Sequence, residues 1–491
     1  MLYRPELYGP DALSGNGAAC DPLSFLFEGT SSDSTPSYPS ISGLSSVSYL
    51  KLSSFMYALT NVTSLAVPFF LKDTLLLTPS QLALFSAFCA TPSFLKPIVT
   101  SLVRPKDRSS TLVACASTQA AMYLTVGYVV HKGIATVPLV CGCMLAHSVA
   151  TAIGTVLSDS MTIESAAKLT SDREAHFLLS DMAMIKRVGL LPVSYLSGYL
   201  LSFVAPATII GAAAVFPATV AVAASLLSNE VNESENTVDD LTMTDQFTLA
   251  TRAMRDTDKG LMSTVTGRGM VMSLAPSYAD AMFFYFTQEM GLSAEFLGRF
   301  QLLGSIASIV GNLTSRYSTN PKQLSNFATI ASVPMYFSVL TIVGTGVTAS
   351  TEYSHLLSLS VGSLVLVRHF VIDFLSAATA QPAAVQLIRT APKGAEGTYL
   401  AMVGTLGDVG GIVNSLISSF SMNWFELDGS NFTGLYDFIV VCNTATAVAT
   451  PSLLYYGPES VKETNFEPKE EEAVHEKSET NERDMSPVRD A

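Results

Sequence analysis

The sequence predicts an all-α membrane protein in which twelve transmembrane helices form two pseudo-symmetric six-helix bundles. Three observations carry this prediction: a composition poor in charge, twelve apolar runs, and an internal repeat. Only 14% of the 491 residues are charged, against roughly 25% in soluble globular domains. The mean hydropathy is +0.37. The formal charge of −14 is concentrated in a polar central segment and the C-terminal tail, so it says little about partners.

Each predicted span is a run of about 20 mostly apolar residues, the length that a helix needs to cross a bilayer. The first six runs cover 46–70, 81–103, 109–131, 134–159, 177–203 and 206–227, and the last six cover 264–287, 295–316, 325–347, 356–388, 398–420 and 435–456.

These runs divide the chain into five parts. We expect a disordered cytosolic tail (1–45), an N-terminal bundle (46–227), a polar cytosolic linker (228–263), a C-terminal bundle (264–456) and an acidic disordered cytosolic tail (457–491). The acidic tail is either a solvated end or an interaction element.

The two halves of the chain resemble each other. FLKDTLLLTPSQLALF in the first half aligns with YFTQEMGLSAEFLGRF in the second, and Leu292 follows Leu77 by 215 positions. The same offset carries Asp159 to within one residue of Asp373. Two parallel six-span repeats joined by a linker are the layout of the major facilitator fold. The alternative is that amphipathic helix starts look alike by chance.

Lysine and arginine near the span ends predict the orientation. One set of connections is rich in these residues: Arg104, Lys106 and Arg108; Lys168 and Arg173; Arg252, Arg255 and Lys259; Arg316 and Lys322; Arg389 and Lys393. The opposite set holds little besides Lys72 and Lys132. The sequence therefore predicts a multi-pass protein with both termini and the linker in the cytosol, in the plasma membrane or an organelle membrane.

The fourth span, HSVATAIGTVLSDSMTIE, is apolar but carries a polar stripe. Helical spacing places His147, Thr151, Thr155 and Ser158 on one face, with Asp159 beside it. A carboxylate inside a membrane helix costs at least roughly 2.5–3.5 kcal/mol on insertion scales, so it normally faces water or a partner. We expect the stripe to line an aqueous path and Asp159 to take part in proton coupling. The alternative is a solvated Asp159 at the cytosolic end of its helix.

The tenth span contains Arg368, His369 and Asp373 within six residues. Arginine suits bidentate binding of a carboxylate, so Arg368 is a candidate for substrate binding. His369 and Asp373 are four residues apart and can meet on one helical face. Because histidine titrates near neutral pH, the pair is a candidate proton relay. A structural lock between the halves is the alternative.

Further candidates for substrate binding lie in three other spans. Lys96 in the second span could attract an anion or could snorkel to the interface. Lys186 and Arg187 in the fifth span could pair with a substrate carboxylate or could be interfacial. Tyr278 and Asp280 in the seventh span are weaker candidates, since aromatic residues in membrane helices more often pack or face lipid.

The sequence contains no motif of an enzyme. Gly-x-Ser-x-Gly, a Walker loop, His-Glu-x-x-His and a dinucleotide fingerprint are all absent. The pair Cys141 and Cys143 lies within a predicted helix and is a poor metal site, because neighbours two apart point to different sides. We expect no enzyme activity, cofactor, metal or nucleic-acid partner. The expected partners are a small-molecule substrate, protons and the lipid bilayer.

Four segments resemble, in order, segments of the folate-biopterin transporter family: FFLKDTLLLTPSQLALFSAFCATPSFLKPI, VLSDSMTIESA, SYADAMFFYFTQEMGLSAEFLGRFQLLGSIASIVG and APKGAEGTYLAMV. The resemblance implies a major facilitator fold and proton-linked movement of folates or pterins. Some members of that family carry S-adenosylmethionine or have no known cargo. Asp159 and Glu164 match its acidic segment in span four, which implies a proton-coupling role for Glu164. Lys96 and Pro97 match its Lys-Pro pair.

The chain departs from the family pattern at two places. IVTSLVRPKD follows Lys96-Pro97 where the family usually has Tyr-Gly and then Ser-Asp, and Ala166 and Ala167 stand where an arginine often follows the acidic residue of span four. These departures concern the cargo rather than the fold. We expect a proton-coupled secondary transporter of folate- or pterin-like anions. The alternatives are a non-transporting receptor or scaffold, or a carrier of S-adenosylmethionine or an amino acid.

Overall fold

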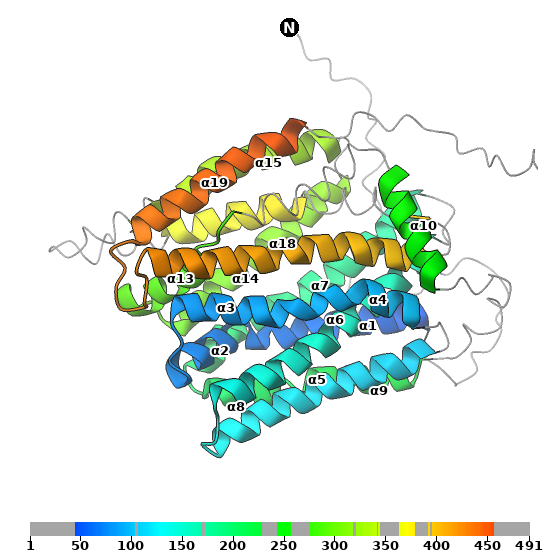
Figure 1. The fold of residues 1–491 in the computed structure, drawn as a ribbon, viewed down its shortest axis with the longest axis horizontal. Helices are drawn as coiled ribbons and strands as arrows, with labels where there is room; N and C mark the ends of the chain where they lie inside the picture. Colours follow the sequence, from blue (N-terminus) through cyan, green and yellow to red (C-terminus); the bar gives the residue numbers. More distant parts are fainter. Residues whose placement is uncertain are drawn as a thin grey trace, which may run out of the picture.

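The computed structural model consists, in the residues that it describes, of helices joined by turns and short connections. These residues are 45–103, 107–167, 172–227, 243–256, 275–317, 321–340, 342–343, 363–378, 391–392 and 395–455. Each of the twelve predicted spans contains a described helix (Figure 1). The predicted tails lie outside these ranges, apart from Ser45.

The first six spans are built as follows: α1 (Ser46–Leu59), η2 (Thr60–Val62), α2 (Thr63–Phe69) and η3 (Phe70–Thr74); α3 (Pro79–Ala90), η4 (Thr91–Leu95) and α4 (Lys96–Leu102); α5 (Arg108–His131); α6 (Val137–Ala167); α7 (Asp172–Leu201); α8 (Pro206–Ala212) and α9 (Val215–Ser225). Span four continues eight residues beyond its predicted end at 159, so Asp159 lies inside α6 and not at its terminus.

The last six spans are built as follows: α13 (Ala279–Phe284) and η8 (Tyr285–Glu289); α14 (Ala294–Tyr317); α15 (Pro321–Phe337); the helical residues 363–378; α18 (Glu396–Trp424); and α19 (Leu435–Tyr455). The predicted polar linker contains a further helix, α10 (Met243–Asp256).

The repeat offset of 215 recurs in the backbone geometry. The π-helical turn η3 (Phe70–Thr74) matches η8 (Tyr285–Glu289) at this offset. Two residues after each turn, Leu76 and Gly291 have positive φ angles of 54° and 63°. The next helices, α3 and α14, also begin 215 residues apart. The internal resemblance in the sequence therefore reflects the same turn, built once in each half.

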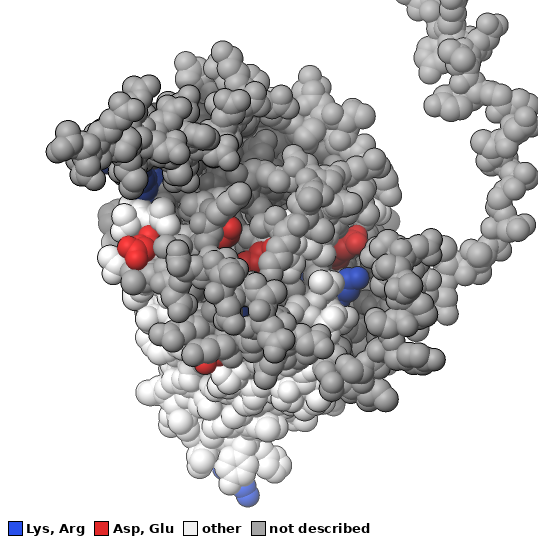
Figure 2. All heavy atoms as spheres, turned by 90° about the vertical axis from the view of Figure 1, so that its right-hand side faces the viewer, with Lys and Arg blue, Asp and Glu red and all other residues white. Residues whose placement is uncertain are grey.

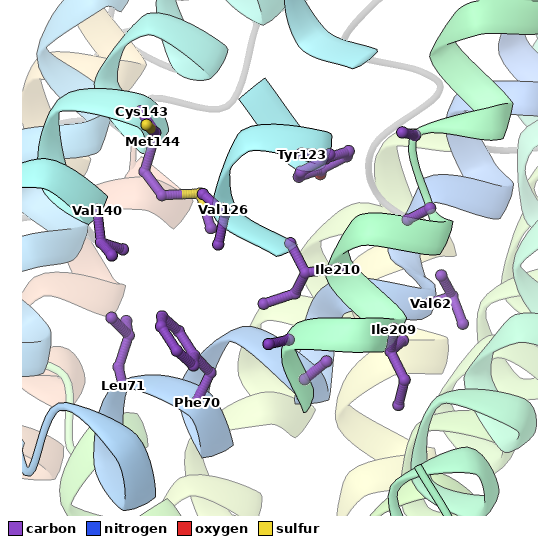
Figure 3. Close-up of a cluster of buried hydrophobic side chains, with 14 of the residues drawn as sticks. Val62, Phe70, Leu71, Tyr123, Val126, Val140, Cys143, Met144, Ile209 and Ile210 are labelled. Carbon is purple, nitrogen blue, oxygen red and sulfur yellow. The ribbon is translucent and has the colours of Figure 1, made fainter. Parts of the chain in front are cut away.

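Apolar side chains from four spans fill the core of the first half. Figure 3 labels ten of them, which converge from η2, η3, α5, α6 and α8: Val62, Phe70, Leu71, Tyr123, Val126, Val140, Cys143, Met144, Ile209 and Ile210. Six described helical spans also have the length and hydropathy of a membrane crossing. The molecule thus has an apolar interior within each bundle and helices suited to lipid outside it.

The two halves meet mainly through α14 and α18 of the second half. Helix α14 packs against α7, and α18 packs against α3, α4 and α6. Helix α10 lies across one end of the molecule (Figure 1), where it contacts α18 and α4. We call this the linker end and the opposite end, which carries η3 and η8, the π-turn end. Figure 2 views the linker end, where acidic and basic side chains are visible at the surface.

Candidate transport site

A cavity of about 300 Å³ lies between the halves. Helices η2, α2 and α7 line it from the first half, and α14 and residues 363–378 line it from the second. Three charged or titratable side chains border it, namely Arg187, His369 and Asp373. The rest of the wall is mainly serine and amide side chains. A polar cavity with contributions from both bundles is the usual position of a substrate site in this architecture.

His369 and Asp373 form a pair on the cavity wall. His369 Nε2 lies 3.1 Å from Asp373 Oδ2, and the side chains are 23% and 30% exposed. The spacing of four residues aligns them on one helical face, as predicted. The ring of Phe300 on α14 stacks on the imidazole with a centroid distance of 3.7 Å and an interplanar angle of 10°. The stack fixes the ring orientation of His369.

Arg187 enters the cavity from the opposite half. It forms no hydrogen bond or ion pair with the described residues, although its charge interacts with that of Asp373. An arginine that lines a cavity without such a partner keeps five N–H donors for a bound anion. The structure thus brings together one predicted substrate-binding residue and two predicted proton-coupling residues.

Arg368 is turned away from this cavity. Its Nη2 donates to the hydroxyl of Tyr278 at 2.5 Å, and its Nε donates to the carbonyl of Met335 at 3.0 Å. These contacts stay within the second half. Asp280, near Tyr278, is half-buried and forms no ion pair with the described residues. The predicted roles of Arg368, Tyr278 and Asp280 in substrate binding stay predictions.

Lys96 joins the two halves toward the linker end. Its Nζ lies 2.6 Å from Asp408 Oδ2 on α18, and the side chains are 22% and 34% exposed. Thr405, one turn earlier on α18, donates to the carbonyl of Ser93 at 3.3 Å. Lys96 therefore contacts the other bundle rather than the membrane interface alone.

The side chain of Asp159 is exposed, and the charges of Lys186 on α7 and Lys96 on α4 act on it. Asp159 and Lys186 do not line the cavity that holds Asp373.

Two other predicted residues of α6, His147 and Glu164, contact α5 of the first bundle. The ring of His147 lies 4.2 Å from that of Tyr123. Glu164 accepts two hydrogen bonds from Arg108 on α5, both 2.7 Å long. No residue of the predicted stripe lines the described cavity. Glu164, for which a proton-coupling role was predicted, is thus held in a bidentate ion pair with Arg108.

The π-turn end has its own contact between the halves. Lys72 Nζ donates to Thr287 Oγ1 at 2.9 Å, and the lysine side chain is only 10% exposed. The rings of Phe69 and Phe283 meet edge to face beside it, with centroids 5.1 Å apart. Lys72 entered the predicted orientation only as a charge, and its contact with Thr287 was not predicted. The internal repeat could have indicated this contact, since Thr287 follows Lys72 by 215 positions.

Most of the chain matches a known protein family. The model of the BT1 family matches residues 59–473. The folate-biopterin transporter of Synechocystis sp. is 26% identical over 420 residues, which cover 83% of this chain and 81% of that protein. Folate transporter 2 of Plasmodium falciparum is 23% identical over 399 residues, covering 78% and 82%.

Solved structures show the same fold. The nucleoside transporter NupG aligns with a TM-score of 0.53 and 14% identity, covering 84% of this chain and 98% of that one. The D-xylose-proton symporter aligns with a TM-score of 0.56 and 13% identity, covering 84% and 97%. The human organic anion transporter MFSD10 aligns with a TM-score of 0.55 and 13% identity, covering 83% and 98%. The chain belongs to the BT1 family and is an integral membrane transporter with the major facilitator fold, not an enzyme.

Proposed function

We propose that this transporter moves folate- or pterin-like anions together with protons by alternating access. One observation carries the proposal: Arg187 from one half and the His369–Asp373 pair from the other border a single polar cavity. A cation supplied by one bundle and a proton acceptor supplied by the other suit a cargo that carries a carboxylate, as folates do.

The same geometry supports a coupling mechanism. Ionised Asp373 attracts Arg187 and competes with an anionic cargo for its guanidinium. Protonation of the carboxylate or of His369 removes this competition, so Arg187 can bind the cargo carboxylate. Release of the proton restores the attraction and favours release of the anion. Proton and anion would therefore be carried in the same direction.

Contacts between the bundles support alternating access. Opening at the linker end would separate α4 from α18 and break the Lys96–Asp408 ion pair. Asp159 belongs to the same half as Lys96, and the two charges already interact. Asp159 can therefore pair with Lys96 once Asp408 has moved away. Opening at the π-turn end would break the contact between Lys72 and Thr287 instead. We assign the linker end to the cytosol, which places both termini there as well.

Uptake into proteoliposomes tests the proposal. We expect a proton gradient, acidic outside, to drive uptake of labelled folate or a pterin above that of empty vesicles. Arg187→Gln should weaken cargo binding by about 1.5–3 kcal/mol, the range for a hydrogen bond to a charged group. Arg299→Gln is the matched control, because Arg299 is 62% exposed and pairs within its own helix.

Coupling needs its own variants. Asp373→Asn and Asp159→Asn should each reduce the dependence of uptake on the proton gradient, whereas Asp437→Asn, at an exposed position, should not. Unaltered gradient dependence in both Asp373→Asn and Asp159→Asn would contradict the coupling role. Uptake of S-adenosylmethionine or an amino acid instead of folates would contradict the proposed cargo and identify the alternative one. Binding without uptake of any tested compound would favour a receptor or scaffold.

A further inference from the structure

Helix α14 has no side chain at the point where it meets the His369–Asp373 pair. A Cβ atom built on Gly304 would lie 2.5 Å from His369 Nε2 and even closer to Asp373 Oδ2. Real Cβ atoms essentially never approach other atoms so closely. Phe300, one turn earlier on α14, stacks on the same imidazole. The two residues thus present a ring and a bare backbone to the pair.

We propose that Phe300 and Gly304 form a niche that holds His369 and Asp373 in contact on the cavity wall, which makes Gly304 a positioning residue for proton coupling. The role of Gly304 in coupling rests on the proposed function, whereas the niche is defined by the positions of Phe300, Gly304 and the pair alone. Gly304 also lines the cavity, so the space at this position is shared by the pair and any cargo.

A second glycine on the same helix distinguishes this role from ordinary helix packing. A Cβ atom on Gly311 would meet the carbonyl of Phe374, the Cβ of Ala377 and the amide of Ala378. Gly311 therefore allows close approach of two backbones. Gly304, by contrast, makes room for the ends of two polar side chains.

Alanine at position 304 should separate the pair without removing any polar group. Its methyl group would push the carboxylate and the imidazole out of the positions that give their 3.1 Å contact. Among the described residues, the charged groups that act on the pair are Arg187 on α7, which faces it, and Arg368 on the helix of the pair itself, which points away toward Tyr278. The cavity-lining residues of η2, α2 and α14 are uncharged. Displacement would therefore change how the pair exchanges protons beside Arg187.

A double-mutant cycle on the full-length protein in detergent tests the niche. We expect Gly304→Ala to lower the apparent Tm in the wild-type background, and to lower it much less in the His369→Ala/Asp373→Ala background, because the clashing atoms are gone. Gly311→Ala should lower Tm equally in both backgrounds. Equal effects of Gly304→Ala in both backgrounds would overturn the niche. If Gly304→Ala folds only in the His369→Ala/Asp373→Ala background, that rescue supports it, and failure to fold in both assigns the glycine to helix packing.

Uptake measured across a series of pH values tests the positioning role. We expect Gly304→Ala to flatten the pH profile and to reduce uptake by up to roughly 100-fold, as misplacement of a reacting group by about 1 Å can do. Gly311→Ala should lower the rate without changing the shape of the profile. A normal profile in Gly304→Ala would refute the positioning role. Absence of folate or pterin uptake by the wild type would refute the proposed function instead, and the cycle would still report on the niche.

Discussion

Lys96 Nζ lies 2.6 Å from Asp408 Oδ2, and these two residues tie the second span of one bundle to the eleventh span of the other. The pair is half-buried, 312 positions apart in sequence, and next to the hydrogen bond between Thr405 and Ser93. Because its partners belong to different bundles, this ion pair reports whether the linker end is closed.

Removal of one charge from this pair should open the linker end. Asp408→Asn leaves Lys96 without its ionised partner, at a cost of about 1.5–3 kcal/mol for a hydrogen bond between charged groups. Cross-linking between cysteines placed at Ser93 and Thr405, in a background without native cysteines, should fall in Asp408→Asn. The exchange Lys96→Asp with Asp408→Lys should restore it. Glu295→Gln, which breaks an exposed pair, should leave cross-linking unchanged.

Loss of the Arg108–Glu164 pair should lower stability rather than coupling. Two parallel hydrogen bonds of 2.7 Å join α5 to α6, and the side chains are 15% and 27% exposed. Glu164→Gln should destabilise the fold by about 1.5–3 kcal/mol, and Arg108→Lys should also lower Tm because lysine cannot form the bidentate contact. Thermal unfolding in detergent measures this loss. A wild-type Tm in Glu164→Gln with altered gradient dependence would instead favour the predicted coupling role.

The contact between Lys72 and Thr287 should hold the π-turn end closed. Lys72→Met retains an apolar stem against Phe69 and Phe283 but loses the hydrogen bond to Thr287. Spin labels on cysteines at Asp73 and Glu289 should show a longer or broader distance distribution by double electron–electron resonance. An unchanged distribution would mean that the aromatic packing alone closes this end.

The crossing of α7 and α14 should not tolerate a methyl group. A Cβ atom on Gly198 would lie 2.8 Å from the Cα of Gly298 and would collide with the carbonyl of Ala294. Gly198→Ala should destabilise the protein by about 1–3 kcal/mol through overpacking, read as a lower Tm. Gly404→Ala is the matched control, since no atom of the described residues outside its own helical turn lies within 4 Å of its Cβ position. Equal Tm values for the two variants would contradict the close crossing.

The sequence predicts which groups are polar within the membrane better than it predicts which of them meet. Apolar length locates the spans, and four-residue spacing predicts the contact between His369 and Asp373. Neighbouring helical residues point about 100° apart, so Arg368 faces Tyr278 while His369 faces the cavity. The helical pattern of one span shows which residues share a face, but it does not show whether that face meets its own bundle or the other one.

Two other features were missed for different physical reasons. Lys96 and Asp408 are paired only after the bundles assemble, so no local pattern marks their contact. Helix α10 is short and polar overall, so it contains no apolar run of membrane length. Its apolar side packs Ala250 against Tyr399 and Val403 of α18.

The matched π-turns set a constraint on how far the two repeats can be alike. Lys72 and Thr287 occupy corresponding places in the two turns and touch each other, so the relation between them approximates a twofold rotation passing through their contact. Identical lysines at both places would set two ammonium groups face to face in a poorly hydrated setting, where their mutual repulsion would be large. A hydroxyl opposite the cation resolves this conflict. Two lysines at this corner are therefore incompatible with closure, so a lysine in one repeat requires an uncharged or acidic residue at the matching place in the other.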